Sequence, residues 1–163
     1  MIDRWAYLEQ LHADGRRVLR WIGRQGVIMC CDPSEQERAR DILLPVFRAL
    51  EDVIRPVPLV ALYLYRQADQ PLSLRTTDGV PMRDVDGIEW KDVTRDRGEL
   101  HAIGLSAEAM KEGPSYLQFL FLHELAHVFS SGEHSPGFHQ QLDRLIEQFN
   151  RSTGGHIVND YCT

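Results

Sequence analysis

The chain has 163 residues, of which 43% are hydrophobic and 26% are charged, and its formal net charge is −6. This composition agrees with an ordinary soluble enzyme of one packed domain, and no apolar run reaches the roughly 20 residues that a membrane-spanning helix needs. Because lysines and arginines are scattered among acidic residues, the charge pattern argues against direct nucleic-acid binding. We expect a monomer that does not associate with membranes.

The three cysteines indicate a reducing compartment. Cys30 and Cys31 are neighbours and poorly placed to bridge each other, and Cys162 lies one residue from the end. An odd number of cysteines without framework spacing suits a reducing environment. The first residues, Met1 to Trp5, are not a charged stretch followed by an apolar core, so no signal peptide is predicted. We therefore expect a cytoplasmic protein.

The first 58 residues are predicted to be mainly helical. Apolar residues between Trp5 and Ile22 recur at mixed helical spacing, which predicts one or two amphipathic helices. Ser34 and Glu37 then form a capping box that opens a helix through about Val53.

A sheet is predicted between residues 59 and 105. The apolar run Leu59–Tyr65 is typical of a buried strand, and the charged stretch Met82–Arg97 indicates an exposed hairpin or loop. The segment Glu99–Leu105 is expected to be an exposed edge strand, to which an extended peptide could add as a further strand. His101 on that strand could contact substrate or stabilise an oxyanion; the simpler alternative is an exposed strand histidine without such a role.

The segment His123–His127 reads His-Glu-Leu-Ala-His and lies inside an apolar run. Residues four apart share one face of a helix, so His123 and His127 can direct ring nitrogens at one ion. Glu124 is offset by about 100° and can instead reach a bound water. The run is apolar almost all round, which predicts a buried helix whose polar groups need partners. A zinc ion would provide a partner for His123, Glu124 and His127 together. The alternatives are that these are hydrogen-bonded core residues, or that the protein is a metal-free relic of an enzyme.

A catalytic zinc normally takes three protein ligands and leaves the fourth position for water. Gly132 can end the helix and turn the chain, so that His134 returns toward the metal. Ser135 and Pro136 look like an N-cap and a first helical residue, so a second amphipathic helix is predicted from Pro136 to Asn150, with Phe138 on its apolar face. Glu147 on this helix is the main alternative for the third ligand, and Glu133 and His139 are further candidates.

The motif and the residues after it resemble the small intracellular zincins of the SprT, WLM and YgjP-type groups. The resemblance rests on His-Glu-Leu-Ala-His, a short glycine-containing turn, and the segment His134-Ser135-Pro136-Gly137-Phe138 that leads into a helix, and it covers about residues 98 to 150. Six residues separate His127 from His134, against five in the WLM and YgjP-type pattern and longer gaps in the SprT pattern, so the subgroup stays open. Ser130 stands where metzincins have glycine, which disfavours that family.

The resemblance implies a minimal zincin-like fold of the α+β class, with a small mixed sheet, an edge strand, the motif helix and a following C-terminal helix. We expect a single domain over residues 1–163, divided into a helical part (1–58), a sheet (59–105), the active-site and C-terminal helices (114–150) and a tail (151–163).

The predicted function is a zinc-dependent metallopeptidase, with one catalytic Zn²⁺ held by His123, His127 and His134. Glu124 acts as general base on a zinc-bound water, and the substrate is a protein or peptide in extended conformation. Alternatives are a non-catalytic zincin-fold binding module and a protease that a partner recruits to DNA. A deformylase-type amidase is a third, but Cys30-Cys31-Asp32 does not match the cysteine element expected there.

A further hypothesis concerns the tail that begins at Gly154. Because zinc accepts thiolate ligands, Cys162 on a flexible tether could enter the cleft and hold the ion in a latent state. A truncation before Gly154 that left the proteolytic rate unchanged would exclude it.

Overall fold

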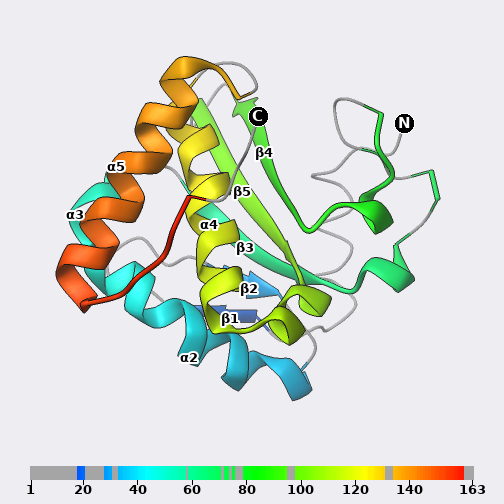
Figure 1. Cartoon of the computed structure of the whole chain (residues 1–163). Helices are drawn as coiled ribbons and strands as arrows, with labels where there is room; N and C mark the ends of the chain where they lie inside the picture. Colours follow the sequence, from blue (N-terminus) through cyan, green and yellow to red (C-terminus); the bar gives the residue numbers. More distant parts are fainter. Residues whose placement is uncertain are drawn as a thin grey trace.

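The computed structural model describes residues 18–20, 28–30, 33–57, 59–70, 72–73, 75, 79–94, 98–130 and 134–159. These residues form an α+β fold in which the helices gather on one side of a mixed sheet (Figure 1). The predicted fold class is confirmed, since the small mixed sheet, the motif helix and the following C-terminal helix are all present.

Among the described residues, the sheet has five strands in the order β1-β2-β3-β5-β4. They are β1 (Val18–Arg20), β2 (Ile28–Cys30), β3 (Leu59–Tyr65), β4 (Gly87–Thr94) and β5 (Gly98–Ser106). The three central strands β2, β3 and β5 are parallel, while β1 and β4 run antiparallel to their neighbours. β4 and β5 form a hairpin that pairs from Gly87 opposite Leu105 to Thr94 opposite Gly98.

The prediction that residues 99–105 form the edge strand is wrong. β5 lies between β3 and β4, and in the described sheet the edge beside it is β4. β4 comes from the stretch 82–97, which was expected to be an exposed hairpin or loop. It pairs with β5 along its whole length and so covers the edge that β5 would otherwise expose. An alternating or apolar pattern predicts that a strand is buried, but not which strand lies next to it.

The prediction of helix up to Ile22 is wrong at Val18–Arg20, which form β1. β1 pairs with β2, and β2 pairs with β3 from the middle of the chain. Pairing with strands that are distant in the sequence stabilises a strand here, even though the apolar residues recur at helical spacing. The sheet therefore extends beyond residues 59–105. The other residues of the predicted N-terminal helices lie outside the described part of the chain.

The helices match the sequence predictions more closely. They are α2 (Pro33–Ala49), α3 (Glu51–Ile54), α4 (Pro114–Phe129) and α5 (Pro136–Thr153), with short 3₁₀ turns η1 (Gln67–Asp69), η2 (Met82–Asp84) and η3 (Ala107–Glu112). The helix predicted from Ser34 to about Val53 is present as α2 and α3, although α2 already begins at Pro33, so that Ser34 lies inside the helix. α5 begins as predicted, because the Ser135 hydroxyl accepts a hydrogen bond from the Phe138 N–H at 3.2 Å. None of the helices among the described residues is long and apolar enough to cross a membrane.

Helix α4 is buried, as its apolar sequence predicts. It packs between the sheet and the helices α2 and α5 (Figure 1). Phe47 of α2 lies against Phe121 of α4, with ring centroids 4.8 Å apart, and both side chains are buried. The core also contains aliphatic side chains from β3, β5, α4 and α5, among them Leu62, Leu64, Ile103, Leu105, Leu117, Leu122, Leu125, Leu142 and Ile146. This core fixes the orientation of the few polar residues that α4 carries.

Candidate metal centre

The two motif histidines lie on one face of α4. Their ring centroids are 5.1 Å apart, which is the neighbour relation expected for residues four apart on a helix. His123 is buried and His127 is half-buried. A buried imidazole needs a polar partner, so a further polar group is expected beside this face of α4.

His134 supplies that group from the turn between α4 and α5. Its Nε2 lies 3.4 Å from Nε2 of His123, and its ring centroid is 5.1 Å from that of His127. One ring nitrogen from each of the three histidines lies within 4.8 Å of the others. The sequence analysis named these same three residues, and the structure brings them together.

The backbone of His134 is in the left-handed region, with φ of 41°. Histidine adopts this conformation more readily than most residues, but it still costs free energy when glycine is absent. Strain of this kind persists where the surrounding structure requires it, and it often accompanies functional sites. Here it accompanies a side chain that meets His123 and His127.

The donor set fits a zinc ion. Zinc in proteins takes imidazole nitrogens at about 2.0 to 2.1 Å in a tetrahedral arrangement, which places two such nitrogens about 3.4 Å apart. The His123–His134 nitrogen separation of 3.4 Å matches this value. Burial lowers the pKa of His123 to about 3 and that of His127 to about 4. Both imidazoles are therefore neutral at pH 7, as ligands must be.

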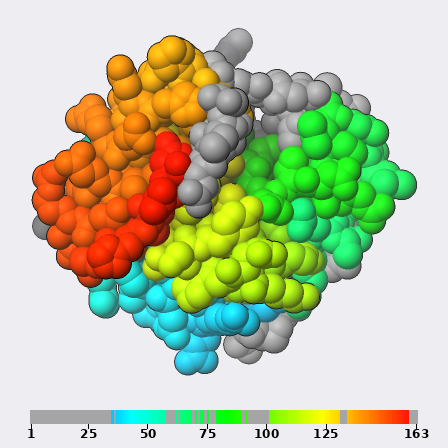
Figure 2. Space-filling model, viewed as in Figure 1, coloured from blue at the N-terminus to red at the C-terminus, as the bar shows by residue number. Residues whose placement is uncertain are grey.

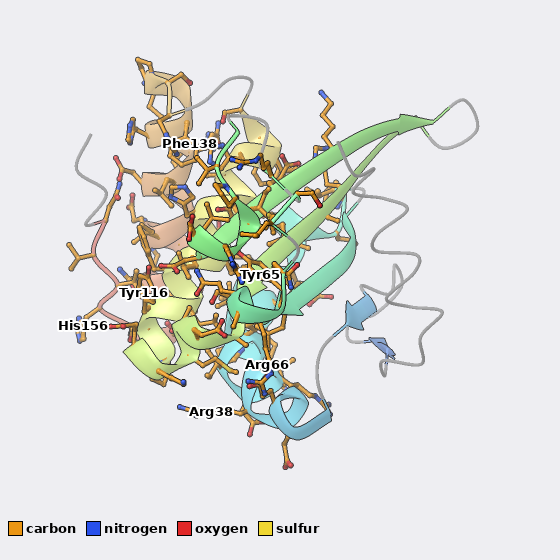
Figure 3. The ribbon with its side chains drawn as sticks, turned by 90° about the vertical axis from the view of Figure 1, so that its right-hand side faces the viewer. Arg38, Tyr65, Arg66, Tyr116, Phe138 and His156 are labelled. Carbon is orange, nitrogen blue, oxygen red and sulfur yellow. The ribbon has the colours of Figure 1, made fainter. Side chains whose placement is uncertain are left out.

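Phe138, in the first turn of α5, supports all three rings. It is fully buried, stacks on His127 with ring centroids 4.3 Å apart, and lies 5.0 Å from the ring centroids of His123 and His134. Figure 3 labels Phe138 near the start of α5. The packing of Phe138 restricts the rotamers of the histidines. The sequence analysis placed Phe138 on the apolar face of its helix and at the end of the segment that carries the resemblance. Its position shortly after His134 was the available signal.

Glu124 lies beside the histidines and is buried. Its Oε1 is 4.0 Å from Nε2 of His123. Burial, with a contribution from the nearby carboxylate of Glu89, raises the pKa of Glu124 to about 8. The metal-free site therefore favours the protonated acid, and a divalent cation held beside it would lower this pKa and favour the carboxylate that a general base requires.

The alternative third ligands are placed differently. Glu147 is on the exposed face of α5, where Arg151 donates to its carboxylate at 2.5 Å. His139 lies beside Phe138, with ring centroids 5.3 Å apart, but is not one of the three clustered histidines. Glu133 and Gly132 lie outside the described residues. The geometry favours His134.

The alternative that His101 is an exposed strand histidine is wrong, because the side chain is buried. Its strand β5 is interior, and its Nδ1 hydrogen-bonds to Oε1 of Glu89 on β4. Direct contact with substrate is therefore not supported. Glu89, whose charge acts on both Glu124 and His127, is a site residue that sequence analysis missed. Nothing in the sequence marked it, since it is one acid within a charged stretch.

The described tail, residues 154–159, folds back along α5 and lies at the surface (Figures 1 and 2). Asn150 holds Ile157 by two hydrogen bonds, and Asn159 donates to Asp143 at 2.9 Å. Cys162 lies outside the described residues, so the latency hypothesis stays a prediction. Because Ile157 is buried, a truncation before Gly154 would also remove part of the core, and replacing Cys162 by serine is the cleaner test.

The metal-free protein is expected to lose stability as the pH falls from about 6.5 toward 4. The folded-state pKa values of His123 and His127 lie below the ordinary 6.5, so the unfolded chain binds protons that the folded chain does not. The measurement is thermal melting of the Glu124→Gln variant in the presence of chelator. This variant is used because the raised pKa of Glu124 would make the parent more stable as the pH falls and so would oppose the effect of the histidines. The midpoint should fall by about 4 °C or more, and a variant that also carries His123→Asn and His127→Asn should show a flatter profile.

Comparisons with known proteins leave the family open. No family model matches the sequence, and no curated protein matches it. Among solved structures, the chain is similar to that of a Wss1 mutant from Saccharomyces cerevisiae, with 15% sequence identity and a TM-score of 0.46. The alignment covers 78% of this chain and 92% of that one. At these values the similarity assigns neither family nor activity.

Proposed function

We propose that this chain is a zinc-dependent metallopeptidase in which His123, His127 and His134 hold one zinc ion and Glu124 is the general base. The observation that carries the proposal is the convergence of three imidazoles within 4.8 Å beside a buried carboxylate. Three imidazole nitrogen donors with a neighbouring acid are the donor set of hydrolytic zinc sites, whereas a structural zinc site is closed by four protein ligands.

The chemistry divides between the ion and the chain. When bound, zinc acts as a Lewis acid toward a carbonyl oxygen and makes a water molecule more acidic. Glu124 would accept the proton of the attacking water, because its carboxylate lies beside the histidine cluster, with Oε1 4.0 Å from Nε2 of His123, and a bound cation favours the ionised form. The same side chain then delivers that proton to the amine of the leaving group. His123, His127 and His134 keep their orientation by packing on Phe138.

The edge of the sheet supports a substrate in extended conformation. Within the described sheet, β4 pairs with β5 on one side only, and its first residue, Gly87, lies against Glu124. A peptide that adds to β4 as a further strand would be held by backbone hydrogen bonds next to the reactive carboxylate. We therefore place the peptide along β4 rather than along β5.

Metal analysis combined with proteolysis tests this function. Purified protein should contain about one zinc per chain, and it should digest casein or a peptide library. A chelator should stop digestion, and added zinc should restore it. Stoichiometric zinc without any chelator-sensitive turnover would instead favour a non-catalytic binding module. Protein that folds but binds no divalent ion would exclude the metallopeptidase.

A further inference from the structure

Gly87, the first residue of β4, lies directly against the side chain of Glu124. A Cβ atom at position 87 would come 3.1 Å from Oε1 of Glu124, 3.3 Å from its Cγ and 3.5 Å from its Cδ. The two shorter separations are tighter than ordinary van der Waals contacts, so a Cβ atom at position 87 would require the Glu124 side chain to shift by a few tenths of an ångström. The glycine therefore lets the strand approach the acid more closely than a side chain would allow.

The backbone just before Gly87 is held in place by several elements. The carbonyl oxygen of Val85 accepts hydrogen bonds from the Tyr65 hydroxyl at the end of β3 and from Nε2 of Gln67, the latter at 3.1 Å. The carbonyl oxygen of Asp86 accepts the N–H of Ser106, at the end of β5, at 2.7 Å. Two successive carbonyl groups are thus fixed to the sheet and to η1, and Gly87 is the next residue.

The side chain of Asp86 connects the same turn to the motif helix. Its Oδ2 accepts the hydroxyl of Tyr116, in the first turn of α4, at 2.5 Å, and its Oδ1 accepts Nε2 of Gln67 at 3.3 Å. Burial and the Asp86 carboxylate raise the pKa of Tyr116 to about 12, so the hydroxyl keeps its proton and remains a donor. Tyr116 and Glu124 lie on one rigid helix. The start of β4 is therefore tied to the element that carries the acid.

We propose that the Val85–Asp86 turn and Gly87 form a positioning device that sets the carboxylate of Glu124 against the edge strand. The turn fixes where β4 begins relative to α4, and the glycine lets the acid occupy the space beside the strand. Gly87, Asp86 and Tyr116 are positioning residues, and their effect on turnover rests on the proposed role of Glu124 as base. The contact itself does not depend on that role.

A stability cycle tests the contact without metal or substrate. Gly87→Ala is introduced into the full chain and into a Glu124→Ala variant, and thermal midpoints are compared in the presence of chelator. The alanine should lower the midpoint in the parent and lower it much less where the Glu124 side chain has been removed. Gly137→Ala is the matched control, because a Cβ atom there meets nothing closer than 3.7 Å. Equal losses in both backgrounds would overturn the proposed contact.

Measurements of kcat and KM test whether these residues position the Glu124 carboxylate. Tyr116→Phe serves as a second variant in case Gly87→Ala does not fold. Both variants should lower kcat by about 10-fold while KM and zinc affinity stay near the parent values, because the base is displaced but the metal ligands are not. Asp86→Asn, which keeps a carbonyl acceptor, should lose less kcat than Asp86→Ala. A change confined to KM, or parent-like kcat in a folded Gly87→Ala protein, would contradict the positioning role. If the parent lacks zinc-dependent turnover, the proposed function fails, but the stability cycle still decides the contact.

Discussion

Replacing Glu124 by glutamine is expected to stop peptide hydrolysis and leave zinc bound. The amide preserves the size of the side chain but cannot accept a proton from water, and general-base catalysis contributes about 10² to 10⁴ in rate. The three histidines are unchanged, so metal content should stay at the parent level. Turnover of casein or a peptide and metal analysis of the same preparation check both parts. Persistent turnover would show that Glu124 is not the base.

The same variant should stabilise the metal-free protein at alkaline pH. Burial raises the folded-state pKa of Glu124 from 4.5 to about 8, so the folded state is penalised increasingly as the pH rises through this window. Glutamine has no such titration. The variant should therefore match the parent near pH 4 and melt higher by at least about 2 to 4 °C above pH 8, which corresponds to about 1 kcal/mol.

Glu147→Gln is the matched control for both measurements. Glu147 is on the exposed face of the neighbouring helix and pairs with Arg151. The substitution should change neither turnover nor metal content, and stability should change by less than about 0.5 kcal/mol. Loss of zinc in this control would reinstate Glu147 as a ligand and contradict the histidine site.

Replacing His134 by alanine is expected to abolish tight zinc binding and, with it, hydrolysis. Loss of an outer hydrogen-bond partner of a metal ligand already lowers metal affinity about 10- to 100-fold, and loss of a ligand should exceed that. Zinc affinity measured by competition with a chelator gives the size of the effect. His139→Ala is the control, because His139 lies in the same region but outside the three-histidine cluster. If His139→Ala lost zinc and His134→Ala kept it, the ligand set would be wrong.

The positive φ of His134 allows a test that separates backbone strain from metal binding. Its φ of 41° is costly for alanine and costs glycine little. His134→Gly and His134→Ala should lose zinc equally, yet in chelator the glycine variant should be more stable by about 1 kcal/mol. Chemical denaturation of the two metal-free variants measures this difference. Equal stability would indicate that the turn relaxes when the histidine is removed.

The local features of the site could be predicted from the sequence. Helical geometry fixes the face on which residues four apart lie, so the spacing of His123 and His127 was sufficient to place both rings on one side of α4. The apolar run around them predicted a buried helix, and Ser135 with Pro136 marked the start of α5. These patterns depend on neighbours within a few residues, and the chain carries that information directly.

Tertiary structure decided which distant segments meet. The order of strands places β4 at the edge and buries His101, because strand pairing joins residues whose local pattern does not name their partner. The return of His134 to the motif histidines depends on how α5 packs against α4, and the closeness of Gly87 to Glu124 depends on the hydrogen bonds that hold residues 85 and 86. Sequence therefore supplied the chemical groups and the helix face, and long-range packing supplied their distances.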